Sequence, residues 1–568
     1  MKILTLHVDY IRFKPLKKAL KIIEELAEPQ KKETKVEEAL AVLTAVEKGD
    51  TDSKGLVENI EEIAKQINVK NIVLYPYAHL SSNLSSPEVA IKILDEAEKF
   101  LKKKFNVTKA PFGYYKEFEL KVKGHPLSEL SRELKFQGKE SDEKYDAKQL
   151  LREISKTKLD TSKLKENDHR ILGQEMDLFS FHDVAPGMVF FHNNGLIIRN
   201  ALIEFWREMH RKNNYNEIKT PQILDQKLWQ ISGHWEKYKE NIFLTEYEKK
   251  LFAIKPMNCP GGMLVYKNKP KSYKEFPLKV GELGEVHRQE LSGVLGGLFR
   301  VIQFTQDDAH IFCTEEQVEE ELKKVIELVD FFYTKFNLPF HVELSTRPEK
   351  RIGDDKVWDK AEAVLEKVLK DKKMKYKINK GDGAFYGPKI DFHVKDSLDR
   401  TWQCGTLQLD FAMPERFELE FTDKDNKKKR PVMLHRTIYG SLERFIGILT
   451  EHYRGWFPTW LAPIQIRVLS FTDRNIEHSK KIIKKIAEKI PNIRLDADFT
   501  QTTIQSKVKD ASLMRIPYVI VVGDKEEKEN KLAVRVRGDN KIQNFEIERF
   551  LEKIEEEINS NFCSQQPQ

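Results

Sequence analysis

The sequence predicts a multidomain chain of mixed α/β and α+β architecture, and three observations support this prediction. Its 568 residues correspond to about four domains of ordinary size. The stretch Glu285–Cys313 is typical of a long antiparallel hairpin, with a glycine-rich loop between two extended segments. Beyond Pro463, short apolar runs alternate with helical patterns, as they do in βαβ units.

The composition indicates a soluble globular protein of the cytoplasm. Hydrophobic residues make up 40% of the chain and charged residues 33%, which leaves ample material for packed cores. A net charge of +7 permits nucleic-acid binding without requiring it. Four scattered cysteines and the lack of a signal sequence favour a reducing compartment. No segment reaches the roughly 18 apolar residues that span a bilayer, so we expect no membrane association.

Residues 1–137 are predicted to form a compact α/β domain. Ile3–Val8 and Asn71–Tyr75 are expected to be strands, Pro87–Phe105 a helix, and Phe118–Val122 a half-exposed strand. The apolar stripe of a further helix consists of Leu56, Ile60, Ile63 and Ile67. Ala39–Val46 fits a helix or a strand, and the pattern does not decide between them.

The charged segment 138–167 is predicted to be a linker with some helix, or else a solvated face that touches nucleic acid. Residues 168–461 form the next predicted domain. One expected helix ends before Pro221, and its proposed stripe is Leu196, Leu202, Phe205 and Met209. A second helix begins with a capping box of Thr314 and Gln317. Its stripe is Val318, Leu322, Val325, Val329, Phe332 and Phe336.

The hairpin at Glu285–Cys313 carries many polar groups. Its first extended segment is expected to include Arg288 and Glu290, and its second to run from about Phe299 through Thr305–His310. Such polar groups are costly to bury unless they bind something. The loop between the segments contains Gly293, Gly296 and Gly297.

Residues 462–560 are predicted to form an α/β domain, and residues 561–568 a disordered tail. The continuous apolar run Tyr518–Val522 is typical of a strand covered on both faces. The other expected elements are strands at Ile464–Ser470, Ile493–Phe499 and Leu532–Val536, and helices at Ile476–Ile490, up to Met514, and up to about Ile558.

Five strings, in this order, carry a resemblance to a known family. They are M-N-C-P-G at Met257–Gly261, F-T-Q-D-D-A-H-I-F-C at Phe304–Cys313, G-A-F-Y-G-P-K-I-D-F at Gly383–Phe392, W-Q-C-G-T-L-Q-L-D-F at Trp402–Phe411, and H-R-T-I-Y-G-S-L-E-R-F at His435–Phe445. The chain resembles class II aminoacyl-tRNA synthetases, and most closely the threonyl-tRNA synthetases. The resemblance implies an antiparallel-sheet catalytic domain, a homodimer built on the first helix, and L-threonine, ATP with Mg²⁺, and tRNA(Thr) as partners. The apolar stripes alone are equally explained by helices that cover a core.

Adenylate formation places negative charge on the phosphates of ATP, and fixed cations stabilise it. Arginine suits this role because its guanidinium is planar and always charged. The resemblance places Arg288 at the α-phosphate and Arg444 at the γ-phosphate, with Glu290 and Arg300 as neighbours on the adenine and Mg²⁺ sides. Arg444 is expected on a helix whose Gly440 and Gly447 leave room for a nucleotide.

The spacing of Cys259, His310 and His435 gives no metal signal by itself. The resemblance implies that they bind one Zn²⁺ per subunit, as an open, catalytic type of site. Threonine would fill the open positions with its amino and hydroxyl groups, and a site built for a hydroxyl rejects valine strongly. Asp308 would accept the hydroxyl proton and Gln306 would help to hold the substrate.

Further substrate-site candidates implied by the matched strings are Met257, Tyr386, Gln403, Thr406 and Gln408. Strict alternation in a strand separates Gln403 from Thr406 and Gln408, and a bulge at Gly405 would reconcile them. His234 matches a family position to which proton transfer is attributed when threonine moves to the tRNA. Gly262 departs from the family, since many bacterial members have histidine there, so no catalytic role is transferred to it.

Three polar strings occur in residues 1–137: Y-P-Y-A-H-L-S-S, A-P-F-G-Y-Y-K and G-H-P-L-S-E-L. Periodicity alone leaves them as turns. As strings they resemble the N-terminal editing domain of archaeal threonyl-tRNA synthetases, which is similar to D-aminoacyl-tRNA deacylases. The resemblance implies hydrolysis of mischarged seryl-tRNA(Thr). The candidate editing residues are Ala78, His79, Tyr115, Lys116, His125 and Glu129, and His7 and Asp9 are expected to line the same pocket.

The last domain resembles the anticodon-binding domain of class IIa synthetases. That resemblance makes Glu526, Arg535 and Arg537 candidates for anticodon contacts. Thr500–Ser506 departs from the bacterial pattern because it carries no basic residue.

The sequence therefore predicts a threonine–tRNA ligase that activates threonine with ATP, transfers it to tRNA(Thr), and removes serine from that tRNA. One alternative is a tRNA-binding synthetase paralogue that lacks activation activity and regulates RNA. The presence of Arg288, Arg444 and all three zinc positions argues against it. Another is a deacylase fused to an inert tRNA-binding module, which the intact catalytic strings oppose.

Overall fold

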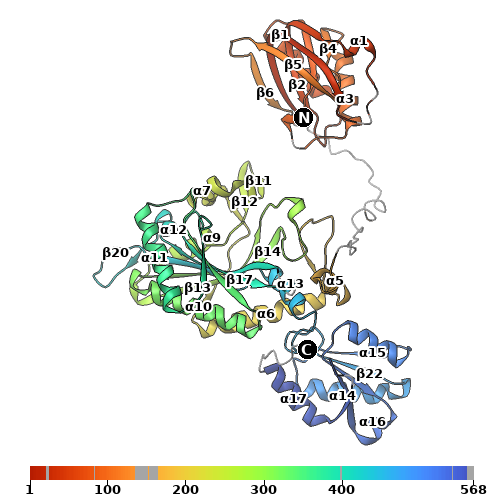
Figure 1. Ribbon diagram of the computed structural model, residues 1–568, viewed down its shortest axis with the longest axis vertical. Coiled ribbons are helices and arrows are strands. Elements are labelled where there is room, and N and C mark those ends of the chain that lie inside the picture. Colours follow the sequence, from red (N-terminus) through yellow and green to blue (C-terminus); the bar gives the residue numbers. More distant parts are fainter. Residues whose placement is uncertain are drawn as a thin grey trace. The chain divides into compact units, whose positions relative to one another are not determined.

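The computed structural model describes residues 1–20, 23, 25–81, 83–134, 151, 164–396, 400–539 and 541–559. The chain divides into two compact units, Met1–Tyr145 and Asp146–Gln568, which are shown in Figure 1. Most of the predicted linker 138–167 and the whole predicted tail 561–568 lie outside the described residues. No helix in the described part of the chain is both long enough and apolar enough to cross a membrane.

The N-terminal unit is a six-stranded sheet covered by helices. Its strand order is β4-β3-β2-β1-β5, and β6 pairs with the other part of β1. Ala39–Val46, which the pattern left open, lies almost entirely in the central strand β2, and the apolar face of β2 packs on α2 and α3. The helices are α1 (Glu28–Lys31), α2 (Lys54–Gln66), the 3-10 turn η1 (Ala78–Leu80) and α3 (Pro87–Leu101). The strands are β1 (Lys2–Lys18), β2 (Thr34–Ala45), β3 (Asn71–Pro76), β4 (Asn106–Lys109), β5 (Tyr114–Val122) and β6 (Glu129–Glu133).

The second unit begins with an eight-stranded sheet in the order β16-β15-β17-β18-β21-β14-β13-β9. All neighbouring pairs are antiparallel except β15–β16 and β13–β9. This confirms the predicted antiparallel-sheet domain. A three-stranded sheet in the order β10-β12-β11 and the two-stranded pairs β7–β8 and β19–β20 lie outside the eight-stranded sheet. The strands of all these sheets are β7 (Phe179–Ser180), β8 (Phe190–Phe191), β9 (Asn216–Glu217), β10 (Ile223–Asp225), β11 (Leu244–Tyr247), β12 (Lys250–Ile254), β13 (Leu278–His287), β14 (Gln303–Cys313), β15 (Phe340–Ser345), β16 (Tyr376–Asn379), β17 (Lys389–Lys395), β18 (Thr401–Asp410), β19 (Phe421–Thr422), β20 (Lys428–Lys429) and β21 (Val432–Thr437).

Helices α6, α10, α11 and α13 pack with this sheet in one large hydrophobic core. The helices are α5 (His169–Glu175), α6 (Asn193–Lys212), α7 (Gln226–Ile231), α8 (His234–Tyr238), α9 (Cys259–Lys267), α10 (Val318–Lys335), α11 (Asp355–Asp371), α12 (Ala412–Arg416) and α13 (Leu442–His452). Short 3-10 turns are η2 (Lys239–Asn241), η3 (Tyr273–Glu275), η4 (Ser292–Val294) and η5 (Glu315–Gln317).

The predicted stripe of α10 is buried throughout, and its capping box is present. The predicted stripe of α6 is wrong at one position, because the side chain of Leu196 is 42% exposed whereas Leu202, Phe205 and Met209 are buried. Leu202 lies six positions after Leu196, and at about 100° per residue the two side chains lie on different sides of the helix.

The hairpin of β13 and β14 exists, but its loop is longer than predicted. Arg288 and Glu290 follow the end of β13, and the second strand begins at Gln303 rather than Phe299. The reason is local hydrogen bonding. The N–H of Phe299 donates to the carbonyl of Gly296 at 3.0 Å, and the N–H of Ile302 donates to that of Gly187 at 2.7 Å, so neither N–H pairs with β13. The carbonyl of Ile302 accepts the N–H of Arg288, just beyond β13, at 2.9 Å.

The C-terminal domain is a five-stranded mixed sheet in the order β23-β22-β24-β25-β26. β22 is parallel to both β23 and β24, which confirms the predicted βαβ pattern. The strands are β22 (Ile466–Ser470), β23 (Leu495–Asp498), β24 (Tyr518–Val522), β25 (Lys531–Val536) and β26 (Ile542–Glu546). The helices are η6 (Asp473–Asn475), α14 (Ile476–Lys489), α15 (Ile504–Leu513), α16 (Asp524–Glu529) and α17 (Ile547–Asn559).

Candidate functional site

The register of two neighbouring strands brings together the three residues predicted to bind zinc. His310 on β14 lies directly opposite His435 on β21, and their ring centroids are 5.0 Å apart. Cys259, the first residue of α9, completes the cluster. One potential ligand atom from each residue lies within 4.8 Å of the others, and all three residues are buried. The tertiary structure therefore supplies the proximity that the sequence spacing did not show.

The donor set of this cluster fits a metal ion. Nε2 of His310 is buried and has no hydrogen-bond partner. Nε2 of His435 lies 2.8 Å from the Asp410 carboxylate, so it donates to that carboxylate and Nδ1 carries the lone pair. Burial raises the pKa of the Cys259 thiol well above its usual value, and a bound cation would favour the thiolate.

Asp410 is itself held in place. Its other carboxylate oxygen accepts the backbone N–H groups of Ala412 and Met413 at 2.8 and 2.9 Å. The sequence analysis did not assign Asp410, although the aspartate in the string Q-L-D-F was a visible signal. A carboxylate behind a histidine fixes the orientation of the ring toward a metal.

A second cluster of possible metal ligands consists of Asp168, His169 and Glu451. Its side chains already have hydrogen-bond and ion-pair partners within the protein. Both ring nitrogens of His169 are bonded, one to Glu451 at 2.8 Å and one to the N–H of Leu298 at 3.0 Å. Arg170 and Arg400 pair with the two carboxylates. These contacts indicate a structural network.

The face of β14 that carries His310 also carries Asp308 and Gln306. The amide nitrogen of Asn258 lies 3.3 Å from Asp308 and 3.4 Å from Gln306, so it links the two side chains. Asn258 precedes Cys259 and was not assigned from the sequence. Tyr386 lies in the turn before β17; its hydroxyl donates to Gln408 on β18 at 2.8 Å, and its ring lies 5.1 Å from that of His435.

The predicted bulge in β18 is confirmed. Gly405 pairs with Phe392 and Gln403 with His393, so Cys404 is the extra residue. The bulge brings Gln403 and Thr406 to one side of the strand, where they are 2.9 Å apart. Both side chains donate to Asp391, a further residue that the sequence analysis missed.

His234 and Met257 are in contact, with Nε2 of the histidine 2.8 Å from the methionine sulfur. Nδ1 of His234 lies 2.8 Å from the Ser232 hydroxyl. Burial lowers the pKa of His234 to about 3, so the ring is neutral at pH 7. A neutral imidazole has one acceptor nitrogen and one donor nitrogen.

The two candidate ATP-binding arginines are held by backbone carbonyls. Arg288 donates from Nε to Pro256 at 3.1 Å and lies over the ring of Phe304, 5.1 Å from its centroid. Arg444 donates to Phe299 at 2.9 Å and to Gln403 at 2.8 Å. Phe304 was not assigned from the sequence.

Glu290 and Arg300 pair with each other across the loop, with nitrogen–oxygen distances of 3.0 and 2.8 Å. The expectation that Gly440 lies on the helix of Arg444 is wrong, and the room for a nucleotide beside Gly447 stays a prediction. Gly440 precedes α13, and a Cβ on Gly447 would lie 3.2 Å from Leu298 and Phe299. These two residues belong to the loop between β13 and β14.

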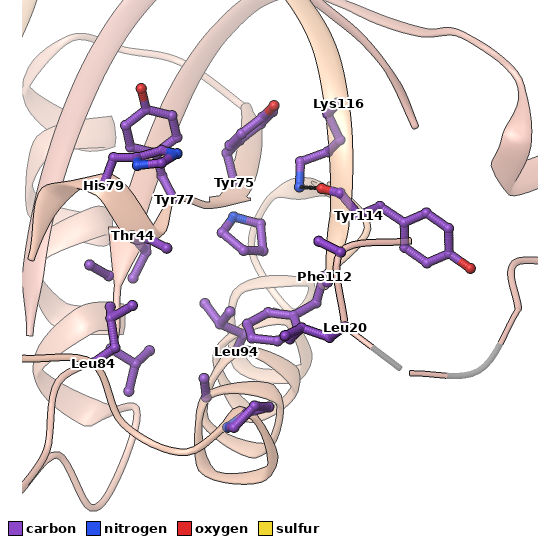
Figure 2. A pocket seen from close by; sticks show the side chains of 18 of the residues that line it. Leu20, Thr44, Tyr75, Tyr77, His79, Leu84, Leu94, Phe112, Tyr114 and Lys116 are labelled. Atoms are coloured by element: carbon purple, nitrogen blue, oxygen red, sulfur yellow. Dashed lines mark hydrogen bonds between the residues drawn. The ribbon is translucent and has the colours of Figure 1, made fainter. Parts of the chain in front are cut away.

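A cavity of about 540 Å³ opens in the N-terminal unit (Figure 2). Of the eight candidate editing residues, Ala78, His79, Tyr115 and Lys116 line it. The ammonium of Lys116 donates to the carbonyls of Pro111 and Tyr114 at 2.9 and 3.1 Å. Burial lowers the pKa of Lys116 to about 8. The remaining lining includes Leu20, Leu84, Leu94 and Phe112, which make one end of the cavity apolar.

The other four candidate editing residues are not among the cavity-lining residues, and the expectation that His7 and Asp9 share the pocket is wrong. Nδ1 of His7 lies 2.7 Å from Nε2 of His125. Asp9 pairs with Lys123 at 2.7 Å. Glu129 is exposed on β6. β1 begins about where predicted but continues to Lys18, and Ala19 and Leu20, which follow it, line the cavity.

The C-terminal domain has a cavity of about 490 Å³ that Glu526 and Arg535 line together with Phe471 and Lys509. Arg537, the third anticodon candidate, points elsewhere. It donates to the carbonyls of Arg515 and Phe457 at 2.8 and 2.7 Å, and burial lowers its pKa to about 10. β25 ends at Val536, so Arg537 lies outside the strand. Strand alternation therefore does not require its side chain to share a face with that of Arg535.

Three ranges of the chain match models of known protein families. Residues 1–134 match the archaea-specific editing domain of threonyl-tRNA synthetase, residues 243–453 the tRNA synthetase class II core domain (G, H, P, S and T), and residues 465–557 an anticodon-binding domain. The chain is 47% identical over 545 residues to a threonine–tRNA ligase of Caldanaerobacter subterraneus subsp. tengcongensis, covering 91% of this chain and 84% of that relative.

Two further matches agree. A threonine–tRNA ligase of Clostridium botulinum (strain Loch Maree) is 54% identical over 394 residues, which span 69% of this chain and 62% of the relative. The solved structure described as the RNA binding domain of threonyl-tRNA synthetase from Cryptosporidium parvum Iowa II has a TM-score of 0.67 at 37% identity. It covers 70% of this chain and 99% of that one.

The antiparallel sheet and the matched core domain define a class II aminoacyl-tRNA synthetase, with an editing domain before the core and an anticodon-binding domain after it. The relatives that match along most of the chain narrow the class further. The chain belongs to the threonine–tRNA ligase family.

Proposed function

We propose that this chain joins L-threonine to tRNA(Thr) in two steps. In the first, a carboxylate oxygen of threonine attacks the α-phosphorus of ATP, which carries Mg²⁺, and pyrophosphate leaves. In the second, a terminal hydroxyl of the tRNA attacks the threonyl carbonyl and AMP leaves. The observation that carries the proposal is the buried cluster of Cys259, His310 and His435 beside Asp308.

The cluster is assigned to one Zn²⁺ per subunit. When bound, the metal supplies open coordination positions for the amino and hydroxyl groups of threonine and thereby selects a hydroxyl-bearing substrate. Asp410 keeps His435 oriented, and Asp308 accepts a hydrogen bond from the substrate hydroxyl. Gln306, Met257, Tyr386 and Gln408 form the surrounding wall.

Arg288 and Arg444 are assigned to the ATP phosphates, because both guanidinium groups are fixed by backbone carbonyls near the polar face of the sheet. Fixed cations stabilise the transition state without reorganising during the reaction. Glu290 and Arg300 are assigned to the adenine and Mg²⁺ sides, and Gln403 and Thr406 to the substrate side. His234, neutral and next to Met257, is the candidate for moving a proton in the transfer step.

The N-terminal cavity is assigned to hydrolysis of seryl-tRNA(Thr). Water adds to the ester carbonyl, the ester bond breaks, and serine and the tRNA hydroxyl are released. Ala78, His79, Tyr115 and Lys116 are its site residues, and Lys116 can polarise the carbonyl or orient the water. Because they are not among the residues that line the cavity, no contact to serine is proposed for His7, Asp9, His125 and Glu129.

Three broader assignments complete the proposal. Glu526 and Arg535 contact the anticodon from the C-terminal cavity. Two copies of the chain form a homodimer, which the exposed apolar side chains of Phe190 and Leu196 support. The protein works in the cytoplasm, in keeping with its free cysteines Cys259, Cys313 and Cys404.

Metal analysis combined with threonine-dependent pyrophosphate exchange tests the proposal. Cys259→Ala should lose both the zinc and the exchange activity. Cys313→Ala, which removes an equally buried thiol outside the cluster, should keep its zinc. Active wild-type enzyme without zinc would refute the metal assignment, and zinc-loaded enzyme without exchange would favour the RNA-binding paralogue.

A further inference from the structure

Two neighbouring aspartates on β14 point to opposite faces of the sheet. Asp308 lies on the face that carries His310 and Gln306. Asp307 lies on the other face and is completely buried. Successive side chains alternate across a strand, so two residues of the same type at adjacent positions have different surroundings. The proposed activation chemistry uses Asp308 and leaves Asp307 unexplained.

The carboxylate of Asp307 accepts three consecutive backbone N–H groups. One oxygen bonds Ile438 at 2.9 Å and Tyr439 at 3.1 Å, and the other bonds Gly440 at 2.9 Å. Consecutive N–H groups that converge on one point bind an anion well. These three residues form the turn between β21, which carries His435, and α13, which carries Arg444.

The turn has little freedom to move elsewhere. Gly440 has a φ of +81°, and a Cβ there would lie 2.4 Å from the carbonyl oxygen of Cys404. The turn is therefore pressed against the bulge of β18. Beyond the turn, Arg444 donates to the carbonyl of Gln403, next to Cys404, at 2.8 Å.

A second buried carboxylate makes the reciprocal contact. Glu443, adjacent to Arg444 on α13, accepts the backbone N–H of Thr305 on β14 at 2.9 Å. Gln306 and Ser441 form a bridge between these two contacts. Strand and helix are thus joined in both directions over a few residues.

We propose that Asp307 is a positioning residue for amino-acid activation, because it fixes the helix that carries Arg444 against the strand that carries Asp308 and His310. The threonine-binding face and the ATP-binding arginine then keep one relative geometry. This inference rests on the proposed role of Arg444. A misplacement of about 1 Å between reacting groups can cost about 10²-fold in rate.

The substitution Asp307→Asn tests this role. Asparagine keeps the shape of the side chain, but its amide nitrogen cannot accept an N–H bond. Pyrophosphate exchange should fall about 10²-fold in kcat, while the zinc content stays at the wild-type level. Glu321→Gln is the matched control, because it neutralises an equally buried carboxylate on α10, and its exchange should stay within about twofold of wild type.

A double-mutant cycle separates positioning from general structural support. If Asp307 acts through Arg444, adding Asp307→Asn to Arg444→Ala should slow exchange by no more than about twofold beyond Arg444→Ala alone. Two outcomes would overturn the positioning role of Asp307 and leave the role of Arg444 intact. One is that the losses of exchange caused by Asp307→Asn and Arg444→Ala multiply in the double variant. The other is near-normal exchange in Asp307→Asn while Arg444→Ala is impaired. Near-normal exchange in Arg444→Ala would instead overturn the proposed role of Arg444, and the inference with it.

If Asp307→Asn does not fold, Glu443→Ala takes its place in the same cycle and should show the same lack of additivity with Arg444→Ala. If neither variant folds, the carboxylates maintain the fold itself and the positioning role is refuted.

Discussion

At the scale of single residues, the role of a side chain depends on its position as much as on its type. Cys259 and Cys313 are both buried thiols, yet only Cys259 lies beside two histidines. Arg535 lines a cavity, whereas Arg537 donates hydrogen bonds to backbone carbonyls. Functional assignments in this chain therefore need the surroundings of each residue.

Arg288 offers a direct test of electrostatic catalysis. Arg288→Ala removes a cation fixed by the carbonyl of Pro256, and threonine-dependent pyrophosphate exchange should fall by about 10²-fold or more. Arg474→Ala is the control, since Arg474 is an exposed cation of the C-terminal domain that pairs with Asp524. Exchange near the wild-type rate in Arg288→Ala would contradict the assignment.

Lys116 predicts a pH dependence for serine removal. Burial lowers its pKa from 10.5 to about 8, so the ammonium loses its proton as the pH rises through about 8. If the charged form polarises the ester carbonyl, enzyme-catalysed deacylation of seryl-tRNA should decline above that pH. The uncatalysed hydrolysis, in contrast, rises with hydroxide.

The variant Lys116→Arg serves as the comparison for that profile. Arginine stays protonated over the whole range, so whatever activity it retains should lose the decline near pH 8. A wild-type rate that climbs steadily through pH 9 in parallel with the uncatalysed reaction would count against a charged Lys116.

At the scale of elements, irregularities position the site as much as regular strands do. The bulge in β18 turns Gln403 toward Thr406, and Arg288 directly follows β13 at the start of the long loop, where its N–H still bonds the carbonyl of Ile302. A bulge re-aims side chains because it inserts one residue into the alternation.

Gly405→Ala should damage this bulge. A Cβ at Gly405 would lie 2.7 Å from the hydroxyl of Tyr333, which accepts the N–H of Gly405 and donates to Ile438. Overpacking of this kind costs about 1–3 kcal/mol in the free energy of unfolding. Urea melts should show the loss, and exchange should fall because Gln403 is displaced. Gly293→Ala, where no atom lies within 4 Å of the new Cβ, should be close to neutral, and equal stability of the two variants would argue against the bulge.

At the scale of the whole molecule, the proposed function assigns selection of threonine and removal of mischarged serine to different domains. Serine carries the same amino and hydroxyl groups as threonine and lacks only a methyl group. A difference of that size is worth about 1–3 kcal/mol, or about 10–200-fold, in binding discrimination. The cavity in the compact unit Met1–Tyr145, to which we assign serine removal, would meet this need.

Removal of residues 1–135 should therefore leave threonine charging intact while seryl-tRNA(Thr) accumulates. Charging assays with each amino acid and discharge of preformed seryl-tRNA measure the two effects. The full-length variant Lys116→Met should reproduce the accumulation without the truncation. Equal discharge rates for the truncated and complete enzymes would show that editing takes place elsewhere.

The sequence by itself determined the domain order, most helices and strands, and the identity of the zinc and arginine candidates. Pattern was sufficient for α10, which buries one face, and for β24, whose continuous apolar run is buried almost throughout, because local pattern and burial coincide there. Matched strings selected Cys259, His310 and His435 as candidates that the structure brings together, although their spacing carried no signal.

Only the tertiary structure decided which of these residues meet. Strand register placed His310 opposite His435, and the end of β25 separated Arg537 from Arg535. Side-chain contacts placed His7 against His125 and Asp9 against Lys123, and Leu298 and Phe299 of the β13–β14 loop pack beside Gly447. Asp307, Asp391, Asp410 and Asn258 emerged only here, because their roles depend on hydrogen bonds between segments far apart in the chain, which local pattern does not encode.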